Sequence, residues 1–281
     1  MFRWAELALQ PSQTHLPFLG DFMRQSGREN ELLLVATSEQ TWADDLVKVK
    51  AQVGQIRLGR DLAERVTEHH LSQGYLEQKL GWAECLTRLG GHWWPQSFVD
   101  RAILLELSQL NTNIDFRKMA LIIGANGLGA MALAALVRYG YRNIRVVDAD
   151  PNKAQDFSTK YRGVFFDINI NHEEIDRISR IYADSTLVVN CLGHGQDDGL
   201  IKDLCYFNYL DEHGLVIETN LFPVESPLVR EARKLGVRVI PGYLVWGRVD
   251  SLWVEHLFGS PLPLKRYQQG LHLACVGATS A

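Results

Sequence analysis

The most regular hydrophobic pattern of the chain lies between residues 120 and 150, where two apolar segments flank a glycine-rich turn and a helical segment. The apolar run Ala120–Ile123 predicts a buried strand that leads into the glycine-rich turn. A helix rich in small residues is predicted from this turn to Tyr139, and a second strand over Ile144–Val147 leads to Asp148. The pattern thus predicts a strand, a turn, a helix and a strand that ends in an acidic side chain.

The pattern continues to alternate between apolar strands and helical segments up to residue 240. Alternating strands and helices are typical of a parallel sheet with helices on both faces. The further strands predicted here are Val164–Phe166, Thr186–Asn190, Leu215–Thr219 and Val237–Ile240, with a helix at Pro227–Leu235 before the last of them. An amphipathic segment, Leu244–Phe258, follows, and the tail after Pro263 is expected to be loosely ordered.

The first hundred residues mix shorter strands with helices. Strands are predicted at Glu31–Ala36 and Gln55–Leu58, and helices at Trp42–Gln52 and Asp61–His70. A further helix, from about residue 96 to residue 110, leads into the glycine-rich unit. The sequence therefore predicts an α/β protein with a Rossmann-type doubly wound parallel sheet and a second, smaller α/β domain.

The glycine-rich unit has the parts of a dinucleotide site. Gly124 permits a tight turn, the following helix N-terminus offers N–H groups and a positive dipole to a pyrophosphate, and Asp148 can bind ribose hydroxyls. Asn126 stands where the G-x-G-x-x-G motif has its second glycine, so a side chain lies where the backbone normally approaches the phosphates. The predicted cofactor-binding residues of this unit are Gly124, Asn126, Gly127, Leu128, Gly129 and Asp148. We predict NAD, because Asp148 would repel the 2′-phosphate of NADP.

Two other interpretations of this unit stay open. The glycines could serve only the close packing of a helix on a strand. A methyltransferase that uses S-adenosylmethionine also has a glycine turn and an acid after its second strand. Such enzymes usually carry an acid just before the glycines, whereas this chain has Leu121, Ile122 and Ile123 there.

Composition narrows the class of protein. The chain has 281 residues, 46% hydrophobic and 22% charged, which is ordinary for a globular protein. A net charge of −4 without a basic cluster argues against nucleic acid as a partner, and the apolar runs are too short to span a membrane. No signal peptide is evident, and the four cysteines are too scattered to indicate a metal site. We expect a cytoplasmic protein that binds a small-molecule substrate and no metal, with a homodimer left open.

Four ordered segments of the second half resemble one known family. Residues 189–193 (VNCLG) are similar to V-N-A-T-P-x-G, and residues 216–228 are similar to D-x-x-Y-x-P-x-x-T-x-L. Residues 231–236 match E-A-x-x-x-G, and Gly242–Gly259 has the length of the G-x-x-M-L-x-x-Q helix. These four motifs are those of the shikimate/quinate dehydrogenase family, which the chain resembles most strongly over residues 120–259. The resemblance adds Asn190, Cys191, Leu192 and Gly242 to the predicted cofactor-binding residues, beside the nicotinamide.

The first half is similar to the family in fewer places. Ser12 and Thr14 resemble the pair of hydroxyls that holds the substrate carboxylate in the family, although hydroxyls that cap a turn or a helix would look the same. The catalytic lysine is missing, since no lysine occurs between Lys50 and Lys79. The positions of the family's catalytic aspartate, substrate-binding glutamine and tyrosine fall on residues 93–95, Val249 and Leu221. Shikimate is therefore not the expected substrate.

Other residues near these positions are candidates for the missing chemistry. His92 is the candidate acid or base, because the ordinary pKa of histidine lies near neutrality. Arg60, or its neighbour Asp61, falls near the position of the missing lysine, and an arginine there would anchor a carboxylate. Glu84 falls where the family has a substrate-binding asparagine and would accept hydrogen bonds from an amine or a hydroxyl. For each of them the residue type alone favours the simpler interpretation, an ordinary solvated residue.

The resemblance implies two domains and leaves two functions to compare. We expect an NAD-binding Rossmann domain at residues 106–242, and a substrate domain at residues 1–105 completed by C-terminal helices at 243–281. The leading hypothesis is an NAD-dependent oxidoreductase that acts on an unidentified small polar substrate. The alternative is a non-catalytic member of the family that binds a nucleotide, since the expected catalytic positions are lost.

Overall fold

The computed structural model describes residues 1–69, 75–110, 114–178, 180, 182–193 and 198–279. The chain divides into two compact units. The first unit comprises Met1–Phe98 and Trp253–Ala274, and the second comprises Val99–Leu252 and Cys275–Ala281. Two helices, α12 (Gly242–Phe258) and α13 (Leu264–Thr279), contribute residues to both units.

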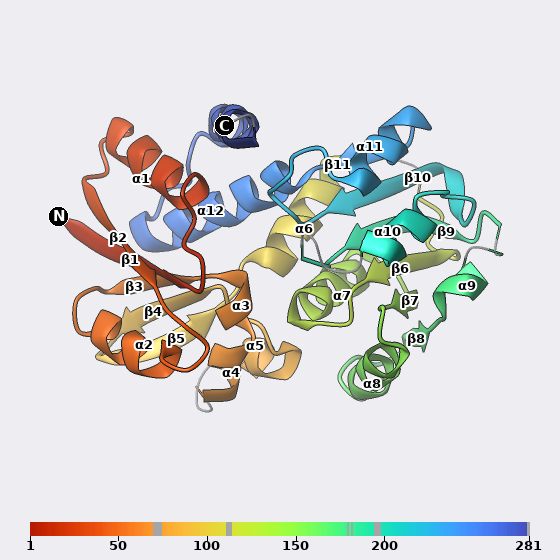
Figure 1. Cartoon of the computed structure of the whole chain (residues 1–281), viewed down its shortest axis with the longest axis horizontal. Helices are drawn as coiled ribbons and strands as arrows, with labels where there is room; N and C mark the ends of the chain where they lie inside the picture. The colour runs from red at the N-terminus through yellow and green to blue at the C-terminus, as the bar shows by residue number, and fades with distance from the viewer. Residues whose placement is uncertain (70–74, 111–113, 179, 181, 194–197, 280–281) are drawn as a thin grey trace. The chain divides into compact units, whose positions relative to one another are not determined.

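The first unit contains a five-stranded sheet with the strand order β2-β1-β3-β4-β5. Strands β1, β2 and β3 are parallel to one another, and β4 runs antiparallel to both of its neighbours, β3 and β5 (Figure 1, red to yellow). The bounds of the strands are Phe2–Ala8 (β1), Asn30–Ala36 (β2), Gln55–Leu58 (β3), Cys85–Leu89 (β4) and His92–Gln96 (β5). The predicted strands β2 and β3 are confirmed, whereas β1 and the β4–β5 hairpin are additional.

The helices of the first unit differ from the predicted ones at several points. The single helix predicted over residues 61–70 is two short helices, with Glu64 between them, and His70 lies outside the described residues. The prediction of a loosely ordered tail is wrong, because residues 264–279 form a long helix. The helices are α1 (His15–Gln25), α2 (Trp42–Lys50), α3 (Arg60–Ala63), α4 (Arg65–His69), α5 (Tyr75–Leu80) and α13 (Leu264–Thr279).

The two faces of this sheet have different chemistry. On one face, Leu7 and Ile56 pack with Trp42 of α2 in an apolar core. Residues alternate between the faces of a strand, so Glu6 and Arg57, the register partners on β1 and β3, project together from the opposite face. Trp253 of α12 packs on that face, because its ring lies 5.0 Å from the ring of Trp4. The second face therefore combines aromatic packing with buried charges.

The second unit contains a six-stranded, fully parallel sheet with the strand order β11-β10-β9-β6-β7-β8. Counted from β6, this is the 3-2-1-4-5-6 order of the Rossmann fold, read from the other side. The strands are β6 (Met119–Ile123), β7 (Asn143–Val147), β8 (Asn169–His172), β9 (Ser185–Asn190), β10 (Leu210–Glu218) and β11 (Arg238–Ile240). The predicted fold class is confirmed by this order and by the mixed sheet of the first unit.

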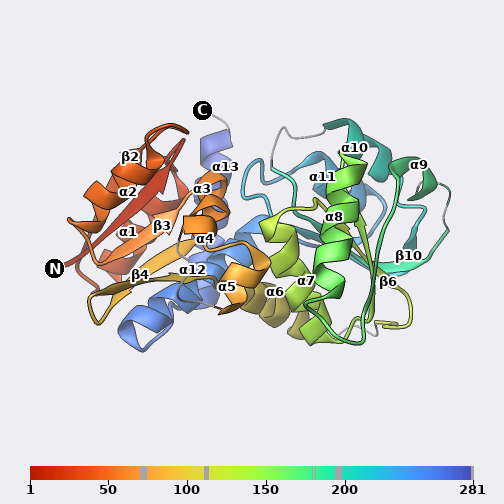
Figure 2. The ribbon, with the colours of Figure 1, turned by 90° about the horizontal axis from the view of Figure 1, so that it is seen from below.

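Helices cover both faces of the parallel sheet. Apolar residues of α9, α10 and α11 form one core with the face of the sheet that carries Leu121, Val188 and Val216. In the other group of helices, α7 contacts β6, α8 contacts β7, and α6 lies against α7 (Figures 1 and 2). The bounds are α6 (Val99–Ser108), α7 (Gly127–Tyr139), α8 (Pro151–Arg162), α9 (Ile175–Ile178), α10 (Asp198–Leu204) and α11 (Pro227–Lys234). Among the described residues, no helix has both the length and the apolar character needed to cross a membrane.

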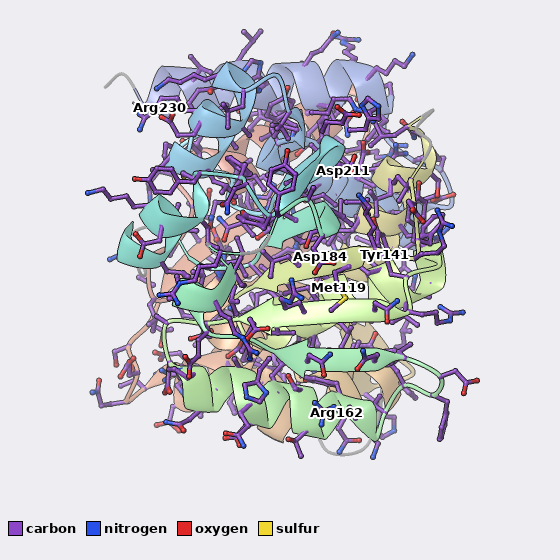
Figure 3. The ribbon with its side chains drawn as sticks, turned by 90° about the vertical axis from the view of Figure 1, so that its right-hand side faces the viewer. Met119, Tyr141, Arg162, Asp184, Asp211 and Arg230 are labelled. Atoms are coloured by element: carbon purple, nitrogen blue, oxygen red, sulfur yellow. The ribbon has the colours of Figure 1, made fainter. Side chains whose placement is uncertain are left out.

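The prediction of a strand at Val164–Phe166 is wrong. The N–H groups of Val164 and Phe165 donate to the carbonyl of Tyr161, so this segment closes helix α8. Phe166 is 86% exposed, which also excludes it from a buried strand. The actual strand, β8, is more polar, and its sequence Asn-Ile-Asn-His has no apolar run that could predict it. Arg162 at the end of α8 donates to the carbonyl of Ile170 and thereby fixes the helix to β8 (Figure 3).

Polar contacts at the amino ends of the parallel strands tie neighbouring strands together. The N–H of Met119 donates to the carbonyl of Asp184, and Lys118 forms an ion pair with Asp211 (Figure 3). The pair lowers the pKa of the Asp211 carboxyl below its usual range. These residues lie at the edge of the sheet opposite the glycine turn, because Gly124 follows the carboxyl end of β6. They are therefore part of the scaffold.

Candidate functional site

The glycine turn after β6 is built so tightly that two of its positions accept only glycine. Gly124 has φ of 105°, which side chains rarely adopt, and a Cβ there would lie 3.0 Å from the carbonyl carbon of Cys191. A Cβ on Gly129 would lie 2.2 Å from the carbonyl oxygen of Gly124, well inside van der Waals contact. The first turn of α7 therefore packs directly on the turn that precedes it, as a dinucleotide site requires.

Asn126, at the position of the missing second glycine, fixes this turn with its side chain. Its Oδ1 accepts a hydrogen bond of 2.8 Å from the N–H of Gly129, which makes Asn126 the N-cap of α7. Its Nδ2 donates to the carbonyl of Cys191 at 2.8 Å, at the end of β9. The side chain thus points into the protein and leaves the N–H of Leu128 without a helical acceptor at the helix start. An asparagine here is compatible with a phosphate at the N-terminus of α7.

Asp148 lies at the end of β7 and is bonded to the same turn. Its Oδ2 accepts from the N–H of Ala125 at 2.8 Å, and its Oδ1 accepts from the N–H of Asp150 at 3.1 Å. Asp148 is 9% exposed. Each carboxylate oxygen has two lone pairs, so one acceptor position on each oxygen is left for a ligand hydroxyl. The residues present therefore fit the adenosine ribose of a dinucleotide.

A buried carboxyl, Glu218, connects the ends of β9 and β10. Nδ2 of Asn190 lies 3.0 and 3.1 Å from its two oxygens, and the hydroxyl of Ser226 donates to Oε2 at 2.7 Å. Asn220 donates to Oε1 from both its N–H and its Nδ2, each at 2.9 Å. Oδ1 of Asn190 accepts from the N–H of Leu192. Glu218 thereby holds the strand end at residues 190–192, which the sequence assigned to the nicotinamide side.

Burial raises the pKa of Glu218 above its ordinary value, although the hydrogen bonds from Ser226, Asn220 and Asn190 oppose this shift. A raised pKa means that Glu218 stabilises the fold at low pH and loses this contribution as the pH rises through its folded pKa. We expect Glu218→Gln to gain stability relative to the wild type as the pH rises above about 4.5, the ordinary value. Urea unfolding between pH 4.5 and 8 measures this difference.

The control for this prediction is the partly exposed Glu231, whose pKa is lowered by the hydrogen bond that it accepts from Lys234. Glu231→Gln is expected to change the pH dependence only slightly and in the opposite direction. Equal pH slopes for the wild type and Glu218→Gln would contradict the assignment of a raised pKa to Glu218.

The start of α12 closes the loop that follows β10. A Cβ on Gly242 would lie 1.9 Å from the carbonyl oxygen of Asn220, so helix and loop are in direct backbone contact. One turn later, the indole N–H of Trp246 donates to the carbonyl of Thr219 at 2.7 Å. Gly242, which the resemblance placed at the cofactor, is thus brought to the loop that Glu218 anchors.

The predicted residues of the first unit are not gathered into one group. Glu84 is buried, and its carboxyl accepts from the indole N–H of Trp82 at 2.9 Å and from the N–H of Phe98 at 2.5 Å. Burial raises its pKa. His92 is exposed at the other end of the β4–β5 hairpin, paired with Leu89. Glu84 lies five residues before Leu89, the partner of His92, so roughly 17 Å of strand separates these two positions.

The other predicted residues of this unit lie at helix starts. The hydroxyl of Ser12 accepts from the N–H of His15 at 2.8 Å, so it does cap the first turn of α1. Thr14 is the N-cap residue, without a side-chain cap bond. Arg60 is the half-buried first residue of α3. Among the described residues, no group of three His, Cys, Asp or Glu side chains is arranged to hold a metal ion.

Sequence reasoning missed Glu6 and Arg57, which form a buried charged centre in this unit. Glu6 is 5% exposed and Arg57 is 3% exposed, and they are register partners on neighbouring strands. The guanidinium of Arg57 lies over the ring of Trp253, at 5.2 Å from its centroid. The available signal was a glutamate within the otherwise apolar segment Trp4–Ala8.

Comparisons with known proteins agree with this architecture. No model of a known protein family matches the chain. The shikimate dehydrogenase (NADP(+)) of Mesorhizobium japonicum is 27% identical over 142 residues, which are 50% of this chain and 48% of that protein. The matched region thus spans about half the length of this curated relative.

Solved structures of the same class align with nearly the whole chain. Shikimate dehydrogenase from Thermus thermophilus, in complex with NADP(H) and shikimate, has a TM-score of 0.77 at 17% identity, and covers 98% of this chain and 100% of its own. The chain has the fold of this shikimate dehydrogenase. Quinate dehydrogenase from Corynebacterium glutamicum, in complex with NAD, has a TM-score of 0.76 at 16% identity, with 96% and 98% covered. The 5-ketofructose reductase of a Gluconobacter strain has a TM-score of 0.77 at 14% identity, with 97% and 98% covered.

These identities are low, so the structural likeness establishes the fold and leaves the substrate of this chain open. The proteins of this fold act on shikimate, on quinate and on a keto-sugar, as their names state. One scaffold therefore accommodates both carboxylic acids and an uncharged sugar.

Proposed function

We propose that the chain is an NAD-dependent oxidoreductase that acts on a small polar substrate other than shikimate. The observation that carries this proposal is the direct bond between the glycine turn and Asp148, which combines a helix N-terminus with a ribose-binding carboxylate. When bound, a nicotinamide dinucleotide supplies a two-electron hydride acceptor or donor. In this proposal residues 106–242 hold the cofactor, and residues 1–105 with 243–281 recognise the substrate.

The proposal favours NAD over NADP for an electrostatic reason. A 2′-phosphate on the adenosine ribose would lie against Asp148, and two like charges about 4 Å apart repel by roughly 1–4 kcal/mol. Asp150, two residues further, uses its carboxylate to cap α8 through the N–H of Asn152 and adds a second negative charge. The curated relative is named for NADP(+), whereas quinate dehydrogenase of this fold was solved with NAD. Cofactor choice is therefore a sharp test of the site.

Asp148→Ala is expected to weaken NADH binding by about 100-fold, because it removes the ribose acceptor and the bond to Ala125 together. Asp148→Asn keeps one acceptor oxygen for the N–H of Ala125 and removes the negative charge. We expect this variant to narrow the preference for NADH over NADPH. Fluorescence titrations of both dinucleotides measure the effects, with S-adenosylmethionine as a competitor that is expected to have none. No saturable NADH binding by the folded wild type would refute the proposed function.

A non-catalytic nucleotide-binding protein is the second candidate function. It is favoured by the bonding of Glu84, whose carboxyl is already held by Trp82 and Phe98, and by the apolar residues Leu221 and Val249 at expected substrate positions. This candidate predicts NADH binding without turnover. A panel of hydroxy acids, polyols, cyclic alcohols and amino acids, assayed with NAD, separates the two, since robust formation of NADH would exclude it.

A further inference from the structure

The buried carboxyl of Glu6 has one oxygen that the protein does not use. Its Oε2 accepts from the N–H of Ser12 at 2.8 Å, in the loop between β1 and α1. Its Oε1 accepts no hydrogen bond from any described residue, although Glu6 is only 5% exposed. Oε1 therefore keeps acceptor capacity for a hydroxyl hydrogen of a ligand.

The charges around Glu6 do not favour an anion. Arg57 carries one positive charge, while Glu6 and Glu84 are two acidic groups within its electrostatic reach. His15 also lies within electrostatic reach of Glu6. With both carboxyls ionised, the four groups sum to −1 when His15 is neutral and to zero when it is protonated. Arg57 is also 3% exposed and is stacked on Trp253. It therefore offers little free positive charge to a substrate carboxylate.

Glu84 cannot replace Glu6 as the open acceptor. Its oxygens accept from Trp82 and from the N–H of Phe98, and with Glu84 only 1% exposed the carboxyl is closed off from a ligand. Ser12, by contrast, is half-buried and uses its hydroxyl oxygen to accept from His15, so its hydroxyl hydrogen can still be donated. Glu6 and Ser12 together thus offer one acceptor and one donor, which complement a hydroxyl group.

We propose that Glu6 makes this site selective for an uncharged, polyhydroxylated substrate, a polyol or a keto-sugar, by accepting a hydroxyl hydrogen at Oε1. The same carboxyl excludes a carboxylic acid from the Ser12 loop by charge repulsion. This inference rests on the proposed oxidoreductase function and specifies its substrate class. It reverses the substrate that Ser12 and Thr14 alone imply, since that pair resembles a carboxylate holder.

The test compares uncharged and acidic ligands in the wild type and in Glu6→Gln. The uncharged probes are 5-keto-D-fructose, D-fructose, sorbitol and myo-inositol, and the acidic probes are quinate, shikimate and gluconate. Each is assayed with NAD or NADH for turnover and by calorimetry for binding to the full chain. Glutamine has nearly the same shape and keeps an oxygen for the N–H of Ser12, so the fold is expected to persist. The control is Glu29→Gln, an exposed glutamate on the same chain segment as β2.

We expect the wild type to bind or convert at least one uncharged probe and to discriminate against the acids. Glu6→Gln is expected to weaken the binding or turnover of that uncharged probe by about 10- to 100-fold. It is also expected to narrow the preference of the protein for the uncharged probe over the acids and to leave the affinity for NADH unchanged. The Glu29→Gln control is expected to match the wild type. If the role of Glu6 were purely structural, Glu6→Gln would lower the affinity for all probes equally. The ratio of the affinities for uncharged and acidic ligands would then not change.

Three results would overturn the inference: no uncharged probe bound or converted, a wild-type preference for the acids, or an unchanged selectivity in Glu6→Gln. Each is informative only if the same preparation binds NADH. Loss of NADH binding in the wild type would instead refute the proposed function, so the two failures are distinguishable.

Discussion

Replacing Gly129 with alanine is expected to abolish measurable dinucleotide binding. The added Cβ would lie 2.2 Å from the carbonyl oxygen of Gly124, and the backbone fixes the positions of both atoms, so neither can rotate away. The N–H of Gly129 is also the donor to Oδ1 of Asn126, so a shift of this residue breaks the cap of α7. We expect a loss of NADH affinity of at least about 100-fold, with a destabilisation of about 1–3 kcal/mol typical of overpacking.

The control for Gly129→Ala is Gly199→Ala in helix α10, where no atom lies within 4 Å of the added Cβ. This substitution is expected to leave NADH affinity unchanged and to stabilise the helix by up to about 1 kcal/mol. Fluorescence titration with NADH and thermal unfolding by circular dichroism measure both variants. Wild-type affinity in a folded Gly129→Ala protein would show that the turn after β6 is not the dinucleotide site.

The second unit was predictable because its strands are buried on both faces. Such strands read as continuous apolar runs, as in Ala120–Ile123 and Thr186–Asn190, and periodicity identifies them without knowledge of their neighbours. The prediction failed at β8, an edge strand with one fully buried residue, Ile170. An edge strand needs apolar residues at fewer positions, so the hydrophobic pattern favours the more apolar turn at Val164–Phe166 over β8.

The first unit was harder to predict because its sheet has a polar buried face. Glu6 interrupts the apolar run of β1, and Arg57 is buried on β3, so neither strand shows a clean alternation. The β4–β5 hairpin could have been found from its turn, since Gly90 and Gly91 both adopt positive φ, at 58° and 84°. A glycine pair of this kind favours the two-residue turn of a hairpin.

Some properties of the candidate site depend on contacts that the sequence cannot supply. The sequence placed Asn126 at a phosphate-binding position, but only the structure shows its side chain bridging Gly129 and Cys191. The sequence identifies Glu218 only as part of a predicted strand. It accepts hydrogen bonds from Asn190 and Ser226 because β9 and β10 are neighbours in the sheet. Motifs predict which residues gather at a strand end, whereas hydrogen-bond direction follows from packing.

Gly242→Ala is the second substitution with a large expected effect. Its Cβ would lie 1.9 Å from the carbonyl oxygen of Asn220 and 3.1 Å from the N of Leu221, so the start of α12 would have to move away from the loop after β10. The same displacement would strain the bond from Trp246 to Thr219. We expect the melting temperature to fall by about 3–10 °C, because overpacking costs about 1–3 kcal/mol in a chain of this size.

The position of Gly242 also makes its functional effect specific. Glu218 links the loop at Asn220 to Asn190, so a displaced loop alters the proposed nicotinamide side while Asp148 and the ribose side stay intact. We therefore expect Gly242→Ala to weaken the binding of NADH more than the binding of ADP-ribose, which lacks the nicotinamide. Gly277→Ala in α13 is the control, since no atom lies within 4 Å of its added Cβ. An equal loss for NADH and ADP-ribose would indicate general destabilisation and would contradict the assignment of this loop to the nicotinamide.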